Sequence, residues 1–167
     1  MFAVVIGVSH YLHLAEGESP APEIFGLGQL RVSALTAFEV FRWLAEGYRV
    51  KGCPLAKCWL LLSPNEEEKV HAPGIAEHLT PATFDNCEQA IGFWWSHMQQ
   101  LPRSVAEHSR ALFFFSGHGL EVHQDQQILL LSDYLKPPQR NWNKVLSTKT
   151  QISHENWGID YRKTDSA

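Results

Sequence analysis

The sequence feature that most constrains the fold is an apolar run at residues 111–115 that ends in a polar, glycine-flanked histidine. The run reads Ala-Leu-Phe-Phe-Phe and is followed by Ser-Gly-His-Gly, with His118 between two glycines. A short continuous apolar run bounded by turn residues is typical of a strand buried on both faces, as in a parallel sheet. Because open α/β folds place their chemistry at the carboxyl ends of such strands, the pattern predicts His118 at that edge.

Further apolar runs alternate with helical patterns along the chain. The other predicted strands are residues 2–8, 58–62 and 128–131. Apolar positions recur at helical spacing over residues 30–47 and 84–98, and Thr80 and Pro81 are the predicted N-cap and first residue of the second helix. Strands separated by helices require right-handed crossovers. We therefore expect an α/β fold with a mainly parallel sheet, helices on both faces, and an incomplete C-terminus.

The chain is expected to form one domain over residues 1–150, followed by a tail. Its 167 residues, 44% of them apolar, suffice for one core. The pattern of residues 142–150 predicts one more short helix. Residues 151–167 contain few apolar residues and no hydrophobic periodicity, which indicates a poorly ordered tail or a truncated element. The three glutamates at residues 66–68 are most simply a solvated turn.

Composition restricts the partners and the compartment. Fourteen basic against eighteen acidic residues give a net charge of −4, without the basic field that phosphate backbones require. The cysteines Cys53, Cys58 and Cys87 form neither a disulfide framework nor a paired metal-ligand spacing. The apolar N-terminus lacks a basic flank and is too short to span a bilayer. We expect a cytoplasmic protein without a nucleic-acid or membrane partner.

Taken together, these segments resemble the front half of a caspase-like cysteine peptidase domain, as found in caspases, metacaspases and bacterial caspase homologues of peptidase type C14. The resemblance covers residues 3 to about 150 and is most specific at residues 116–119. The segments that support it are residues 3–11, 30–44, 60–62, 79–83, 113–119 and 129–134. It implies a three-layer α/β sandwich that hydrolyses peptide bonds with a Cys/His dyad and no cofactor.

The resemblance also implies roles for individual residues. His118 is the general acid/base, a task suited to a group that titrates near neutral pH. Gly119 resembles the glycine whose backbone N–H helps to hold the oxyanion, and its lack of a side chain lets the substrate come close. Arg31 lies where a caspase-like arginine would recognise an acidic substrate residue, and it could equally be a solvated residue at a helix start.

Two features depart from the family pattern. The first helix has Thr36 where such domains commonly have an aspartate. In caspase-type proteases the nucleophilic cysteine lies about 50 residues after the histidine, and no cysteine follows Cys87. The nucleophile is therefore expected just beyond residue 167, and this chain alone is expected to be inactive. A truncated product, a processed fragment and a separate cysteine-bearing chain all fit.

The residues present offer weaker candidates for a nucleophile. Cys58 at a strand start and Cys87 on a helix packing face are positions where cysteine behaves as a small hydrophobe. Cys53 lies in a loop at the opposite edge of the predicted sheet. Ser116 lies near His118, but no acid is placed to orient the imidazole and the Gly-x-Ser-x-Gly elbow is missing.

A metal site is the less favoured explanation of the histidines. His118, His123, His10, His13 and Asp125 could be gathered around an ion, but their spacing matches no known ligand signature. Loop histidines near an active-site rim explain them more simply. In the same way, Trp94 and Trp95 at helical spacing indicate core or a docking face rather than a ligand platform.

Two other functions stay open at this point. A non-catalytic caspase-like module would bind or regulate an active relative instead of cleaving peptides. A small doubly wound domain resembling flavodoxin-like or receiver modules would need paired acids or a phosphate loop after residue 8, and the sequence has neither. Expected partners are a peptide or protein substrate and a chain that supplies the missing strands, or a second copy, because a sheet ending at residues 128–131 leaves an apolar edge.

Overall fold

β1 (Phe2–Val8) is the middle strand of a three-stranded parallel sheet in the computed structural model, which describes residues 1–123, 126–137 and 146–147. β2 (Lys57–Ser63) and β3 (Ala111–Ser116) pair with its two sides. Most of β1 is buried, because a middle parallel strand has both edges paired and both faces covered. The α/β class and the first three predicted strands are thereby confirmed.

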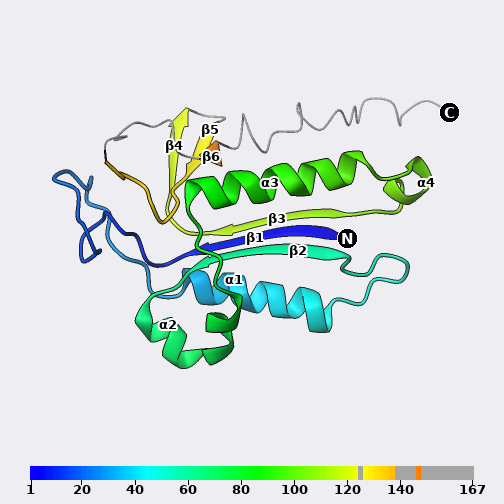
Figure 1. The fold of residues 1–167 in the computed structure, drawn as a ribbon, viewed down its shortest axis with the longest axis horizontal. Coiled ribbons are helices and arrows are strands. Elements are labelled where there is room, and N and C mark those ends of the chain that lie inside the picture. The colour runs from blue at the N-terminus through cyan, green and yellow to red at the C-terminus, as the bar shows by residue number, and fades with distance from the viewer. Residues whose placement is uncertain (124–125, 138–145, 148–167) are drawn as a thin grey trace.

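Helices cover both faces of this sheet (Figure 1). On one face lie α1 (Ser33–Arg42), its π-helical extension η1 (Trp43–Gly47), α2 (Glu66–His71) and the 3₁₀ helix η2 (Pro73–His78). The other face packs against α3 (Phe84–Gln99), which the short α4 (Arg103–Ala106) follows. Successive strand residues point to opposite faces, so Val4 and Ile6 join the core under α3 while Ala3 and Val5 join the core under α1.

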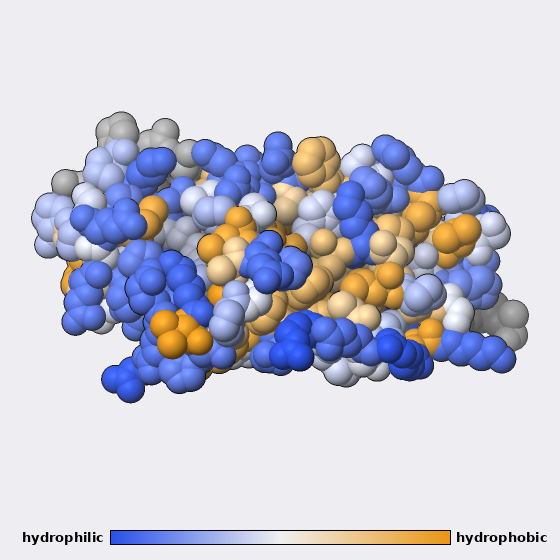
Figure 2. All heavy atoms as spheres, turned by 60° about the horizontal axis from the view of Figure 1, so that its bottom comes forward, coloured by the Kyte–Doolittle hydropathy of each residue, from blue (hydrophilic) through white to orange (hydrophobic). Residues whose placement is uncertain are grey.

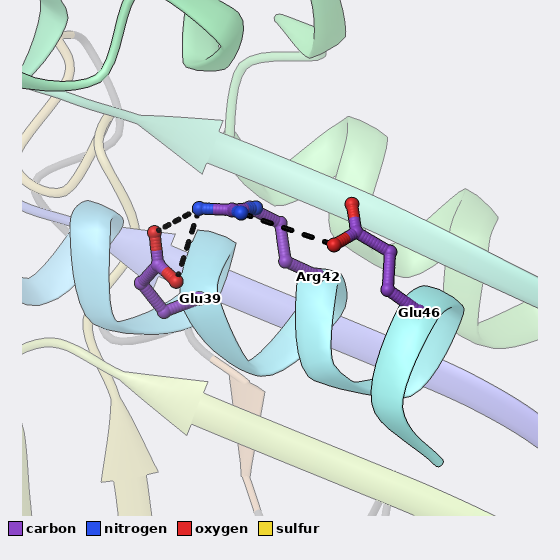
Figure 3. Close-up of polar contacts among 3 residues, drawn as sticks. All are labelled: Glu39, Arg42 and Glu46. Carbon is purple, nitrogen blue, oxygen red and sulfur yellow. Dashed lines mark hydrogen bonds and ion pairs between the residues drawn. The ribbon is translucent and has the colours of Figure 1, made fainter. Parts of the chain in front are cut away.

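α1 lies directly on β1 where the strand carries a glycine. A Cβ added at Gly7 would lie 2.6 Å from the Cβ of Ala37 and 2.7 Å from the Cα of Ala34. The outer surface of α1 is polar, and Arg42 lies between Glu39 and Glu46 with N–O distances of 3.1 and 3.8 Å (Figure 3). These side chains are largely exposed, so the ion pairs contribute little to stability.

The start of α3 differs from the predicted start by three residues. The N-cap is Thr83, whose Oγ1 accepts the Asn86 N–H at 3.4 Å, and the Asp133 carboxylate accepts the Phe84 N–H at 2.8 Å. Thr80 is not the cap, because its carbonyl accepts the Leu62 N–H at 2.8 Å and so lies against the edge of β2. Tertiary hydrogen bonding thus overrides the local Thr-Pro signal.

The glutamates at residues 66–68 form α2 rather than a solvated turn. Asn65 and Glu68 make a reciprocal capping box, in which the Asn65 side chain accepts the Glu68 N–H and the Glu68 carboxylate accepts the Asn65 N–H. Glu66 and Glu67 are exposed, but Glu68 is only 2% exposed. The expected solvated turn was therefore wrong, and it was wrong most clearly at Glu68.

The fourth predicted strand does not extend the parallel sheet. β4 (Gly119–His123) and β5 (Gln126–Leu129) form an antiparallel hairpin, and β6 (Leu146–Ser147) pairs antiparallel with β5. The few residues between β4 and β5 cannot make the long crossover that a parallel pair needs. Leu130 and Leu131 lie after β5 and are fully buried. The predicted parallel strand at residues 128–131 was therefore wrong, and β4 was not predicted.

The predicted C-terminal elements fall mostly outside the described residues. Within residues 142–150, the described pair Leu146–Ser147 is a strand, so the predicted helix was wrong there. The predicted tail at residues 151–167 lies wholly outside the described part. None of the helices within the described ranges combines the length and apolar character needed to span a membrane.

Apolar surface remains on the outside of this fold. Seen from the side of α1 and α2, apolar side chains form a band across the middle of the molecule, between hydrophilic borders (Figure 2). In the described part, β2 and β3 are both edge strands, since each pairs only with β1. The open apolar edges of the parallel sheet are thus β2 and β3, and not residues 128–131 as expected.

Candidate active site

His118 lies two residues after β3, at the carboxyl end of the parallel sheet, and is half-buried. Its backbone is fixed on both sides. The His118 N–H donates to the hydroxyl of Tyr11 at 2.8 Å, and the His118 carbonyl accepts the Leu130 N–H at 2.9 Å. The Tyr11 ring lies 5.1 Å from the imidazole, centre to centre. The loop after β1 and the β4–β5 hairpin therefore hold the histidine between them.

One ring nitrogen of His118 is committed to a backbone carbonyl. Nε2 lies 2.8 Å from the carbonyl oxygen of Gly28. A carbonyl oxygen can only accept, so Nε2 carries the proton that it donates. In the neutral ring Nδ1 is then unprotonated and able to accept a proton. The contact thus orients the imidazole and assigns its basic nitrogen.

Tyr11 supports this arrangement from the core. Its side chain is fully buried, and its hydroxyl accepts the His118 N–H while donating to the Leu130 carbonyl at 3.4 Å. Burial raises the pKa of the Tyr11 phenol, so the hydroxyl keeps its proton. Gly117 makes room for it, because a Cβ there would lie 3.0 Å from the Tyr11 hydroxyl and 2.7 Å from the Phe115 ring.

Gly119 presents its backbone N–H away from the hairpin. Since the Leu130 N–H bonds to the His118 carbonyl, His118 and Leu130 form a hydrogen-bonded pair of the antiparallel ladder. The next pair, Gly119 and Leu129, is then a non-hydrogen-bonded one, in which the backbone groups point outward. Gly119 is also exposed. Its N–H can therefore meet a developing negative charge on a bound carbonyl oxygen.

A buried carboxylate fixes the segment that contains Gly28. Glu68 accepts hydrogen bonds from the Ser9 hydroxyl and the Leu35 N–H, both at 2.8 Å, as well as from the Asn65 N–H at 2.9 Å. The Ser9 carbonyl in turn accepts the Leu30 N–H at 2.9 Å. Glu68 thus joins the carboxyl end of β1 and the start of α1 to α2. This residue was missed in the sequence, although the Asn-x-x-Glu spacing is a capping signal.

Arg31 lies in the same segment, between Gly28 and α1. Its carbonyl accepts the Asn65 side-chain N–H at 3.2 Å, and its side chain is exposed. Within the described ranges its guanidinium makes no ion pair. Arg31 is thus free to meet a ligand near this edge. Thr36 is exposed on α1 and donates to the Val32 carbonyl at 2.7 Å.

The cysteines of the described part do not approach His118. Cys58 is the second residue of β2, at the opposite end of the sheet, and Cys53 is buried in the loop before it. Cys87 is fully buried in α3. Burial raises the pKa of the Cys58 thiol to about 12 and also raises the pKa of Cys87, to which the charge of Asp133 adds. Reactive cysteines instead have a lowered pKa, which favours the thiolate.

The histidines form no metal site where the structure describes them, and Trp94 belongs to the core. No group of three His, Cys, Asp or Glu side chains that could hold a metal ion occurs among the described residues, and Asp125 lies outside them. The Nδ1 of His13 lies 2.9 Å from the Ser19 carbonyl. Trp94 is buried and donates to the Phe2 carbonyl at 3.2 Å, which confirms it as core.

Comparison with known proteins assigns no family to this arrangement. The chain matches no protein-family model, no curated protein and no solved structure.

Proposed function

We propose that this chain is the histidine-bearing part of a caspase-like cysteine endopeptidase, with His118 as general acid/base. The observation that supports this most strongly is the hydrogen bond from His118 Nε2 to the Gly28 carbonyl, which leaves Nδ1 as a base at the carboxyl edge. A parallel sheet between two helical layers is compatible with such a domain. The substrate is a peptide or protein.

The proposed reaction uses His118 twice. Nδ1 takes the proton from a thiol, and the thiolate attacks the carbonyl carbon of the scissile amide. The Gly119 N–H donates to the oxyanion as it forms. The imidazolium then gives its proton to the leaving amine, which leaves a thioester. Water attacks that thioester while Nδ1 accepts its proton, so the acid product and the free thiol are released and the histidine is regenerated.

The thiol comes from outside the described residues in this proposal, and the open edge of β3 is where it would enter. The Phe2 N–H bonds to the Arg110 carbonyl at 2.9 Å, so even-numbered residues of β3 face β1. Odd-numbered residues such as Phe113 and Phe115 then direct their backbone groups to the open edge. A strand added there in parallel would end beside His118, where Nδ1 is available.

Arg31 is the proposed substrate-recognition residue. It lies three positions after Gly28, whose carbonyl holds the imidazole, and its guanidinium is exposed. A guanidinium at this edge would pair with a carboxylate of the substrate. We therefore expect acidic P1 residues to be preferred over basic ones.

The test uses the tagged protein purified from its native cells, so that any cysteine-bearing partner is retained. Fluorogenic peptides with P1 Asp, Arg or Lys report cleavage. We expect the P1 Asp peptide to be cleaved, the cleavage to stop after thiol alkylation, and His118→Gln to lower kcat/KM about 10³-fold. Cys58→Ala should leave the rate unchanged.

Far-ultraviolet circular dichroism of each variant shows whether the fold is retained. Cleavage that persists in a folded His118→Gln variant would overturn the proposal. Absence of cleavage of all the peptides would also overturn it, in favour of a binding module without catalysis.

A further inference from the structure

A groove of about 600 Å³ runs along the outer edge of β2, on a part of the molecule that the proposed chemistry does not use. The floor is formed by residues 57–61 of β2. One wall comes from α1, η2 and the segment after it, and the other comes from α3. The wall residues are Phe41, Glu77, His78, Leu79, Thr80, Asn86, Gln89, Ala90 and Phe93.

The floor of the groove offers unpaired strand backbone. The Ser63 carbonyl accepts the Ser9 and His10 N–H groups, so odd-numbered residues of β2 face β1. Leu62 faces the other way and donates to the Thr80 carbonyl. By the same alternation, Cys58 and Leu60 direct their N–H and C=O groups into the groove. An open edge of this kind is a template for one more extended strand.

The chain itself occupies one position of this edge and then leaves it. Leu79 has an extended backbone, with φ −76° and ψ 93°, and Thr80 accepts the hydrogen bond from Leu62. Pro81 follows and has no N–H to continue a ladder. Toward the amino end of β2, the edge at Leu60 and Cys58 is left free among the described residues.

The walls are suited to apolar side chains on both faces of an added strand. Phe93 is 51% exposed and Leu79 is 44% exposed, so both side chains are open to a ligand in the groove. Trp59 packs with the core under α3, and Leu60 packs with the core under α1. Alternate side chains of a strand paired with β2 would therefore fall against Phe93 on one face and Phe41 on the other.

The charges of the groove favour an acidic group at one end. Lys57 is the first residue of β2, and its ammonium lies 4.6 Å from the centre of the Trp59 ring. Within the described ranges it has no ion-pair partner. Glu77 lies on the η2 wall and disfavours a second acid on that side. A carboxylate near Lys57 would therefore find a cation that is already partly desolvated by the indole.

We propose that this groove binds an extended, mainly apolar peptide segment of a partner protein, paired with β2 through Cys58 and Leu60 and carrying a carboxylate beside Lys57. A second copy of this chain is the less suitable occupant, because the β2 edge forms the floor of a groove. Two recessed edges cannot approach each other, whereas a single extended segment can enter.

The probes are two fluorescein-labelled heptapeptides, Glu-Thr-Val-Ile-Val-Thr-Ala and its reversed sequence, because the strand could add in either direction. Fluorescence anisotropy with the full chain measures binding. We expect saturable binding of at least one peptide. N-methylation of its central isoleucine should weaken the binding about tenfold or more, because pairing with the edge is lost.

Charge reversal tests the position of the carboxylate. Lys57→Glu should weaken binding about five- to tenfold, and a peptide with Lys in place of Glu should restore it. Lys136→Glu makes the same charge change outside the groove and should leave binding unchanged. Phe93→Asp, at a half-exposed site that tolerates a polar residue, should abolish binding.

Several results would overturn the proposal: no binding of either peptide, equal binding of the N-methylated form, or indifference to both Lys57→Glu and Phe93→Asp. A concentration-dependent dimer that Phe93→Asp dissociates would also overturn it, because a second copy would then be the occupant. None of these measurements depends on peptidase activity.

Discussion

At the scale of single residues, the position of one proton on His118 decides which ring nitrogen can accept a further proton. Because Nε2 donates to the Gly28 carbonyl, the neutral ring should be protonated at Nε2 and not at Nδ1. Long-range ¹⁵N–¹H NMR of histidine-labelled protein distinguishes the two forms by the nitrogen chemical shifts. A neutral ring protonated mainly at Nδ1 would contradict the hydrogen bond on which the proposed function depends.

Two tyrosines with buried hydroxyls, only one of which contacts His118, allow a matched test of the hydrogen bond to the His118 N–H. Tyr11→Phe removes the acceptor of the His118 N–H and should lower the free energy of unfolding by about 1–3 kcal/mol. The Tyr48 hydroxyl is buried and has no hydrogen-bond partner among the described residues. Tyr48→Phe should therefore be neutral or stabilising. Urea denaturation measures both, and equal losses would show that Tyr11 contributes only packing.

At the scale of elements, Glu68 joins three segments, and its loss should separate them. Glu68→Gln keeps the size of the side chain but turns one acceptor oxygen into a donor that faces another N–H. We expect a loss of about 2–3 kcal/mol in the free energy of unfolding. Glu67→Gln, on the exposed side of α2, is the matched control and should have almost no effect. Faster hydrogen exchange at the Leu35 amide would locate the change at the start of α1.

The elements that were predicted correctly are those whose signal lies within the element itself. The runs at residues 2–8, 58–62 and 111–115 are apolar throughout because helices cover both faces of the parallel sheet, although the edge strands β2 and β3 are mostly half-buried. The run at residues 128–131 has the same composition, yet its pairing with β4 depends on a turn and on residues elsewhere in the chain. Composition gives no information on strand direction, so that strand was assigned to the wrong sheet.

The candidate site was predictable only in part for the same reason. Glycines on both sides of His118 at the end of an apolar run were sufficient to locate the histidine and Gly119. Its partners were not predictable, because the Gly28 carbonyl and the Tyr11 hydroxyl are 90 and 107 residues away in sequence. Glu68 was missed because a run of acids resembles a solvated surface, and only the tertiary fold buries one of them.

At the scale of the whole molecule, two thiols and one phenol with raised pKa values make the free energy of unfolding fall at alkaline pH. The folded-state pKa values of Cys58 and Cys87 are raised by burial, as is that of Tyr11. Between the unfolded pKa near 9 and about 12, the unfolded chain loses the Cys58 proton while the folded chain keeps it. The free energy of unfolding should therefore fall as pH rises through this window.

Urea denaturation at a series of pH values from 7 upward measures this dependence. The combined variant Cys58→Ala and Cys87→Ala should show a shallower decline than the parent, because two of the groups with raised pKa are gone. An identical slope in the two proteins would assign the alkaline loss to other groups.

The hydrogen bond between His118 and the Gly28 carbonyl determines which mutations this segment of the chain can tolerate. The group that steers the imidazole is a main-chain oxygen, so replacement of the amino acid at position 28 cannot delete it. A Cβ at Gly28 would meet no atom within 4 Å, so Gly28→Ala should be nearly silent in thermal unfolding. Removing one residue between positions 20 and 27 would shift that oxygen out of register and misalign the imidazole. Spacing, rather than amino-acid identity, is what natural selection would have to preserve there.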